Sequence, residues 1–286
     1  MNEDWQTLLE QQLNAAVTSQ KRVGGGDFAQ STCLTLSDKR HVFLKTHENP
    51  PLNFFTTEAT GLTWLRETRT VPIPQVLWVS DNPPGLALQW IDEGPRATTG
   101  EQQLGERLAE LHRFPFDTYG RPDHRTTGSL ALPNTPSTDW VTFYRECRLQ
   151  PLIKLAESHH ALPANTRRKL SNLCDKLEQF APPELRPSLV HGDLWAGNRV
   201  IDKDGVSWLI DPAAHGNHRE FDLAMMHLFG GYQPECFAAY NETFPLDDGW
   251  LDRIPLFQLA PLIVHAIKFG GHYAQATHDA VTRYVD

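Results

Sequence analysis

Apolar residues recur with two different periods in the first ninety positions of the chain. Residues 5–17 and 55–65 carry apolar side chains at helical spacing, which predicts a helix in each segment. Shorter apolar segments between turn residues predict four strands, at 33–36, 42–45, 76–79 and 86–90. The first two strands follow the glycines at 24–26 and form a predicted hairpin. This part of the chain is therefore expected to be a small β-rich lobe.

The pattern becomes helical from Thr98 onward. Apolar stripes predict three helices, at 102–113, 138–156 and 165–180. The one strand signal here is a hairpin over 198–211 with an Asp-Gly turn, which would bring Asp211 beside Asn198. We therefore predict an α+β, bilobal protein with a nucleotide-binding lobe at 1–91 and a mainly α catalytic lobe at 92–286. The cleft between two such lobes is a usual place for a bound cofactor.

Composition narrows the possible partners and the compartment. The 286 residues include 26 Lys and Arg against 35 Asp and Glu, a net charge of -9, which disfavours nucleic acid and anionic membranes as partners. Any phosphate site must then be a local positive pocket. The four cysteines form no C-x-x-C pair, so neither a zinc nor a redox motif is expected. An acidic start and the lack of any long apolar segment predict no signal peptide and no membrane span, with the cytoplasm as the default location.

The strongest chemical signal is the segment His191-Gly192-Asp193-Leu194-Trp195-Ala196-Gly197-Asn198, followed by Ile210-Asp211-Pro212. Its Asp, Asn and Asp have the order and spacing of a kinase catalytic loop and its metal-binding strand. A single Asp would more often cap a turn or end a strand. The ordered set around a predicted hairpin instead indicates a small-molecule kinase.

The sequence resembles the fructosamine kinase (ketosamine-3-kinase) family, a branch of the aminoglycoside-phosphotransferase-like kinases, from about residue 24 to 272. The most specific matches are the Trp195 form of the loop, the segment Arg219-Glu220-Phe221-Asp222-Leu223-Ala224 and the ending Phe229-Gly230-Gly231. The resemblance implies a protein-kinase-like fold and ATP-dependent phosphorylation of the sugar 3-hydroxyl of ketosamines, as fructosamine or ribulosamine adducts, free or on glycated proteins. The resemblance also implies a role in deglycation. The sequence leaves the oligomeric state open.

Catalytic and metal roles can be assigned from the chemistry of phosphoryl transfer. Asp193 is expected to orient the acceptor hydroxyl and take its proton, while Asn198 and Asp211 hold Mg²⁺. His191 is expected to order the loop, and Asp222 to hold the loop's backbone N–H groups. Asp-Pro-Ala after Ile210, in place of the Asp-Phe-Gly of protein kinases, predicts a constitutively assembled site.

ATP is expected to be held by the first lobe. Lys45 at a strand end and Glu58 on the next helix could pair while Lys45 touches the phosphates, although such residues are more commonly solvated. Gly24, Gly25 and Gly26 could fold over the phosphates; no Walker A motif is present. Backbone groups of Gln89, Trp90 and Ile91 are expected to meet the adenine.

Substrate contacts are expected beside the catalytic loop. The candidates that bear on the sugar or order the loop are Trp195, His215, His218 and Arg219. A Trp is as often simply part of the core, and the two His lack partners for a zinc site. The resemblance departs at Leu132, where the family carries Gln, and at Asp27, where some relatives carry a redox-sensitive Cys, so no thiol regulation is expected there.

Two alternatives stay open. The wider superfamily includes aminoglycoside, choline and other small-alcohol phosphotransferases, which share the catalytic loop. A non-catalytic binding protein on a kinase scaffold is the third reading, since fold alone does not establish activity. Retention of Lys45, Asp193, Asn198 and Asp211 together argues against it.

Overall fold

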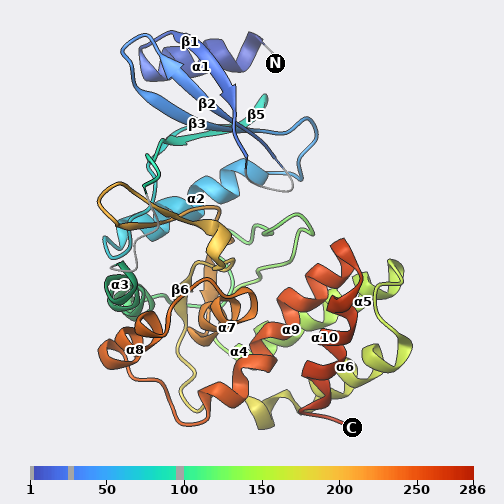
Figure 1. The fold of residues 1–286 in the computed structure, drawn as a ribbon. Helices are drawn as coiled ribbons and strands as arrows, with labels where there is room; N and C mark the ends of the chain where they lie inside the picture. Colours follow the sequence, from blue (N-terminus) through green and yellow to red (C-terminus); the bar gives the residue numbers. More distant parts are fainter. Residues whose placement is uncertain (1–2, 25–28, 95–99) are drawn as a thin grey trace.

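The protein has a β-sheet at one end and a larger helical body below it (Figure 1). The computed structural model describes residues 3–24, 29–94 and 100–286. The β-rich beginning and mainly α remainder confirm the predicted α+β class.

The first part of the chain forms an antiparallel sheet with strand order β1-β2-β3-β5-β4. Its elements are α1 (Glu3–Leu13), β1 (Val17–Arg22), β2 (Gln30–Leu36), β3 (His41–Thr46), α2 (Phe54–Glu67), β4 (Val76–Asp81) and β5 (Pro84–Gln89). The four predicted strands and two helices are confirmed, but the first helix ends at Leu13 rather than at 17. Strand β1 was missed because its residues after Val17 are polar and exposed, as a strand at the edge of the sheet allows.

The two faces of the sheet pack against different helices. On one face, Leu44 and Ala87 join Trp5 and Leu9 of α1 in a small core. On the other face, Leu86 and Leu88 of β5 belong to the core that contains α2. Since successive side chains of a strand point to opposite faces, Lys45, next to Leu44, points toward α2.

The rest of the chain is mainly helical. Its elements are α3 (Glu101–Arg113), α4 (Trp140–Tyr144), the π-helix η2 (Arg145–Leu149), α5 (Gln150–Ser158), α6 (Ala164–Lys176), the 3₁₀-helix η3 (Leu177–Phe180), β6 (Ser188–Val190), the 3₁₀-turn η4 (Ala196–Asn198), β7 (Arg199–Ile201), β8 (Ser207–Leu209), β9 (His215–Asn217), α7 (Glu220–Phe229), α8 (Pro234–Thr243), α9 (Trp250–Phe269) and α10 (His272–Thr282). The predicted helices at 102–113 and 165–180 correspond to α3 and to α6 with η3. The helix predicted at 138–156 is instead made of α4, the π-helix η2 and α5. The π-helix ends two residues before Pro151, which lacks an N–H donor.

The predicted hairpin is also present, as β7 paired with β8. The β6–β9 pair was not predicted, because strands of three buried residues have too little pattern to be detected.

One hydrophobic core joins the sheet region to the helical body. It contains Leu62 and Leu65 of α2, Leu104 and Leu108 of α3, and Leu209 of β8. A second core lies within the helical body, between α4, α5, α6, α7, α9 and α10. The shared core means that α2 is held by both parts of the molecule.

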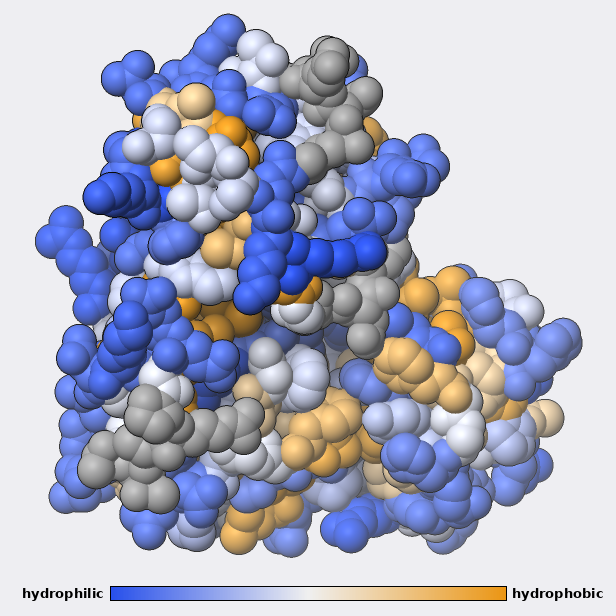
Figure 2. Space-filling view, turned by 45° about the horizontal axis from the view of Figure 1, so that its top comes forward, coloured by the Kyte–Doolittle hydropathy of each residue, from blue (hydrophilic) through white to orange (hydrophobic). Residues whose placement is uncertain are grey.

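The face drawn in Figure 2 is mostly hydrophilic. On the face drawn in Figure 2, apolar residues form several separate patches between hydrophilic ones. Within the described part of the chain, no helix combines the length and the apolar character needed to span a membrane.

Candidate active site

A buried carboxylate fixes the backbone of the segment that follows β6. Asp222, from α7, accepts hydrogen bonds from the backbone N–H of His191 at 2.7 Å and of Gly192 at 2.9 Å. His112 contacts the same carboxylate at 3.2 Å. The His191 ring donates from Nε2 to the carbonyl of Ile210 at 2.9 Å. These contacts confirm the expected structural roles of Asp222 and His191.

The turn at Gly192 requires glycine. Its φ is +82°, and a Cβ there would lie 2.3 Å from the carbonyl oxygen of Ala213. An L-residue would therefore meet both an unfavourable conformation and a steric clash. This close approach places Asp193 against the segment that carries Asp211.

Asp193 is held in a partly buried position by Asn198. The Asn198 Nδ2 donates to the Asp193 backbone carbonyl at 2.8 Å and to its Oδ2 at 2.9 Å. Burial raises the pKa of Asp193 to about 7, and the nearby negative charge of Asp211 contributes to this rise. A carboxylate with a pKa near neutrality is suited to accept a proton from a hydroxyl group.

The β7–β8 hairpin returns the chain to Asn198, as predicted. Arg199 pairs with Leu209, and the backbone N–H of Ile210 donates to the carbonyl of Asn198 at 3.0 Å. Asp211 follows directly, with an unusual φ of +56°. The hairpin thus sets the Asp211 carboxylate beside the catalytic loop.

Lys45 and Glu58 form the predicted pair, and Asp211 joins it. The Lys45 Nζ lies 2.7 Å from Glu58 Oε1 and 2.5 Å from Asp211 Oδ1. Burial alone would lower the pKa of Lys45, but the two carboxylates outweigh it and raise that pKa above its ordinary value. Burial also raises the pKa of Glu58, against the opposing effect of Lys45. The ammonium group is therefore charged and fixed between α2 and the catalytic loop.

Asn198 and Asp211 offer a donor set that suits Mg²⁺. Because Asn198 donates through Nδ2, its Oδ1 remains available as a ligand, and Oδ2 of Asp211 is not the atom that Lys45 contacts. Among the described residues, no group of three or more His, Cys, Asp or Glu could hold a metal ion. An amide and a single carboxylate instead match the way Mg²⁺ is held together with substrate phosphates.

Comparison with known proteins decides the family. The family model for fructosamine kinase matches residues 1–286. The chain belongs to the fructosamine kinase family. It is 36% identical to a probable ketoamine kinase from Enterococcus faecium, over 94% of this chain and 96% of that protein. It is 30% identical to a chloroplastic protein-ribulosamine 3-kinase from Arabidopsis thaliana, over 97% of this chain and 86% of that protein.

Solved structures agree with this assignment. A fructosamine-3-kinase homologue from Thermobifida fusca is 33% identical, with a TM-score of 0.89 over 97% of each chain. A choline kinase from Streptococcus pneumoniae shares the fold alone, at 14% identity and a TM-score of 0.67 over 98% of this chain and 99% of that one. The predicted bilobal, protein-kinase-like fold is confirmed, and this member of the fructosamine kinase family is a phosphotransferase.

The residues predicted to hold ATP are only partly described in this family member. Gly24 is exposed, and an added Cβ there would meet no atom of the described residues within 4 Å. Gly25, Gly26 and Asp27 lie outside the described residues. Gln89 ends β5, where its side-chain Oε1 accepts from the backbone N–H of Gln75 at 3.3 Å. Trp90 and Ile91 follow it and are half-buried. These three residues thus lie at the end of β5, before the mainly helical part of the chain.

The four substrate candidates have different surroundings. Trp195 is 41% exposed and meets the Phe229 ring edge-on at 6.0 Å. His215, His218 and Arg219 are buried. Trp195 is therefore the candidate that can still contact a ligand.

The three buried candidates make contacts within the protein. His215 Nδ1 donates to the Ala213 carbonyl at 2.7 Å, and Arg219 donates to the carbonyls of Phe244 and Pro245. Burial lowers the pKa of His218 to about 3 and that of His215 well below its usual range, so both rings are neutral. All three side chains therefore take part in packing within the protein.

Lys268 near the end of α9 was missed by sequence reasoning. Its positive charge acts on Asp193, where it opposes the rise in the pKa of that carboxyl. Nothing in the sequence pattern links a lysine in a distant helix to the catalytic loop. The proximity of Lys268 to the catalytic loop depends on the packing of α9 against α7.

Proposed function

We propose that this protein is an ATP- and Mg²⁺-dependent kinase that phosphorylates the sugar 3-hydroxyl of ketosamines. The single observation that carries the proposal is the position of Asp193, with its pKa near neutrality, beside Asn198, Asp211 and Lys45. Membership of the fructosamine kinase family and the similarity to ketoamine and ribulosamine kinases support the substrate class.

In the proposed reaction, Asp193 accepts the proton of the acceptor hydroxyl while the hydroxyl oxygen bonds to the γ-phosphorus of ATP. The bond from that phosphorus to the β,γ-bridging oxygen breaks, and ADP leaves. Lys45 would contact the phosphates, and Asn198 and Asp211 would hold Mg²⁺, which would supply positive charge to the phosphate oxygens. Positioning supplies most of the rate enhancement in such a site.

The product of this reaction is a ketosamine 3-phosphate, a labile adduct whose breakdown frees the amine. We therefore infer a role in deglycation of free amino compounds or of proteins. We further propose residues 1–91 and 92–286 as the two lobes, with the nucleotide bound where the strand end at Gln89 meets the helical body.

The substrate is tested by an ATP-consumption screen with a ribulosamine, a fructosamine, kanamycin and choline. The Asp193→Asn protein serves as the blank. We expect the ketosamines to be used at least about 10²-fold more efficiently, by kcat/KM, than kanamycin or choline, because unpaired polar groups in a site reject poorly matched acceptors. Phosphorus-31 NMR of the product then shows which hydroxyl carries the phosphate.

A higher kcat/KM for kanamycin or choline would replace the ketosamine proposal with one of the alternatives from the wider superfamily. Phosphorylation of a different sugar hydroxyl would overturn only the 3-hydroxyl assignment. ATP turnover that is equal in the Asp193→Asn blank would remove the proposed base.

A further inference from the structure

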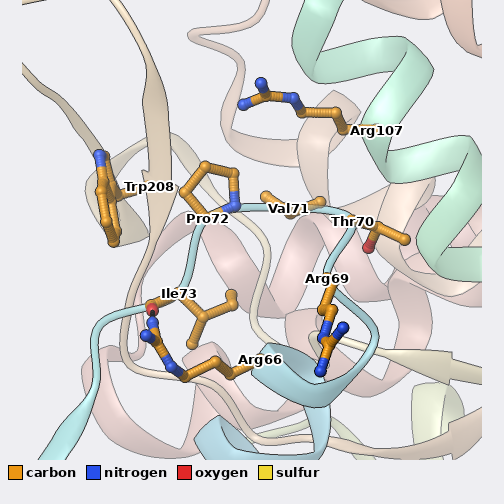
Figure 3. A pocket seen from close by; sticks show the side chains of 8 residues that line it. All are labelled: Arg66, Arg69, Thr70, Val71, Pro72, Ile73, Arg107 and Trp208. Carbon is orange, nitrogen blue, oxygen red and sulfur yellow. Dashed lines mark hydrogen bonds between the residues drawn. The ribbon is translucent and has the colours of Figure 1, made fainter.

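A pocket of about 420 Å³ lies away from the catalytic residues, at the end of α2 (Figure 3). It is formed by the end of α2 and the following segment to Ile73, by α3 and by β8. Its lining combines three arginines with apolar side chains: Arg66, Arg69, Arg107, Val71, Pro72 and Trp208. Neither Asp193 nor Asp211 lines it, so it is not part of the site already described.

The pocket is positively charged on a protein of net charge -9. Among the residues that the structure describes, no acidic side chain lines it. Arg66 donates through Nη1 to the carbonyl of Ile73 at 2.7 Å and retains its other N–H groups. Within the described part of the chain, the guanidinium groups of Arg69 and Arg107 have no hydrogen-bond or ion-pair partner. Figure 3 shows that Arg107 reaches the pocket from α3, whereas Arg66 and Arg69 come from the end of α2.

The backbone at Arg69 is unusual. Its φ is +56°, in the left-handed region just after α2, where helices commonly place glycine or asparagine. A bulky residue in that conformation is uncommon, and such conformations concentrate at functional sites. This conformation ends α2 and leads the chain into the segment to Ile73 that lines the pocket.

We propose that this pocket binds a small molecule that carries a phosphate group. Guanidinium groups match phosphate oxygens in charge and in hydrogen-bond geometry. Val71, Pro72 and Trp208 offer apolar surface to the rest of an organic phosphate. Free phosphate shares the same anchoring chemistry.

The position of the pocket connects it to both lobes. The carbonyl of Pro72 accepts the backbone N–H of Leu209 at 3.0 Å, two residues before Asp211. Helix α2, which ends at the pocket, carries Glu58 at its other end. The pocket therefore lies where the end of α2, α3 and β8 meet.

Isothermal titration calorimetry without nucleotide or acceptor tests this proposal independently of the kinase activity. The probes are ribose 5-phosphate, inorganic phosphate and, as the neutral control, ribose. We expect at least one phosphate probe to bind with a Kd of about 1 mM or tighter, and ribose not to bind. Tighter binding of ribose 5-phosphate identifies an organic phosphate as the ligand, and equal binding identifies phosphate alone.

Variants locate the bound probe. Arg69→Gln/Arg107→Gln should weaken binding by about tenfold or more, because charge-assisted hydrogen bonds are lost. Arg283→Gln, at an exposed arginine after α10, is the matched control and should bind as wild type. Lys45→Met should also bind as wild type. Loss of binding only in Lys45→Met would place the probe in the nucleotide cleft, and equal loss in Arg283→Gln would indicate nonspecific attraction; either result, or no binding at all, overturns the proposal.

Discussion

Replacing Asp193 by Asn should slow catalysis strongly and at the same time stabilise the fold. The variant keeps the shape of the side chain but removes the proton acceptor and the negative charge. We expect kcat to fall by at least about 10²-fold, because a positioned base contributes that much to proton transfer. Nucleotide affinity should change little, since Asp193 acts on the acceptor.

The stabilisation follows from the raised pKa of Asp193. Its rise from 3.8 to about 7 means that the folded protein binds this proton more tightly than the unfolded chain does. The contribution of protonated Asp193 to the free energy of unfolding is therefore fully present below pH 4 and is lost as the pH rises toward 7. At 1.36 kcal/mol per pKa unit, this shift means that ionised Asp193 lowers the free energy of unfolding by about 4 kcal/mol. Because Asp193 is only partly buried, we expect about 2 kcal/mol, or about 4 °C in Tm.

Differential scanning fluorimetry without Mg²⁺ checks this, since the metal would itself lower the pKa. The Tm difference between Asp193→Asn and wild type should be largest at pH 8 and about half as large at pH 5.5. Asp175→Asn, at an exposed position on α6, is the matched control and should show no such pH-dependent gain. A Tm gain that does not vary with pH, or a lower Tm at pH 8, would refute the reasoning.

Three further outcomes are expected. Gly192→Ala should lose activity and far more Tm than Gly230→Ala, because both glycines have positive φ but only a Cβ at position 192 meets the Ala213 carbonyl; equal losses would contradict the steric argument. Trp195→Ala should lower kcat/KM for a ketosamine by about tenfold or more and leave the KM for ATP nearly unchanged, as steady-state kinetics with each substrate varied will show. The four cysteines are free, and three are buried, so mild peroxide should give no disulfide-linked dimer on non-reducing electrophoresis; a reversible dimer band coupled to inactivation would be the opposite result.

The parts of the site that could be predicted are those encoded by short-range patterns. The Asp-Gly turn fixes the register of the β7–β8 hairpin, and that register alone brings Asp211 back to Asn198. The alternation of side chains in β3 likewise directs Lys45 to the α2 face, where Glu58 meets it.

Other features depend on tertiary packing that no local pattern records. His218 and Arg219 follow the catalytic loop closely in sequence, yet His218 stacks on Phe257 of α9 and Arg219 lies against Phe244. Proximity in sequence therefore did not show what these two side chains pack against, and it gave no sign of Lys268, which is far away in sequence and acts on Asp193. The burial of a side chain depends on which elements pack against it, and this packing is determined by the whole chain.

The packing of α2 also bears on how the enzyme is controlled. Gly61 of α2 allows Ala214 so close that an added Cβ would lie 3.0 Å from the Ala214 Cβ. Arg121 donates to the Ala214 carbonyl at 2.6 Å and lies over the Trp64 ring of α2 at 4.3 Å. The helix that carries Glu58 is thus fixed to the segment just after Asp211. Protein kinases are commonly switched on by moving the equivalent helix. Here α2 packs against both parts of the molecule, so we expect the ion pair between Lys45 and Glu58 to be present without such a movement.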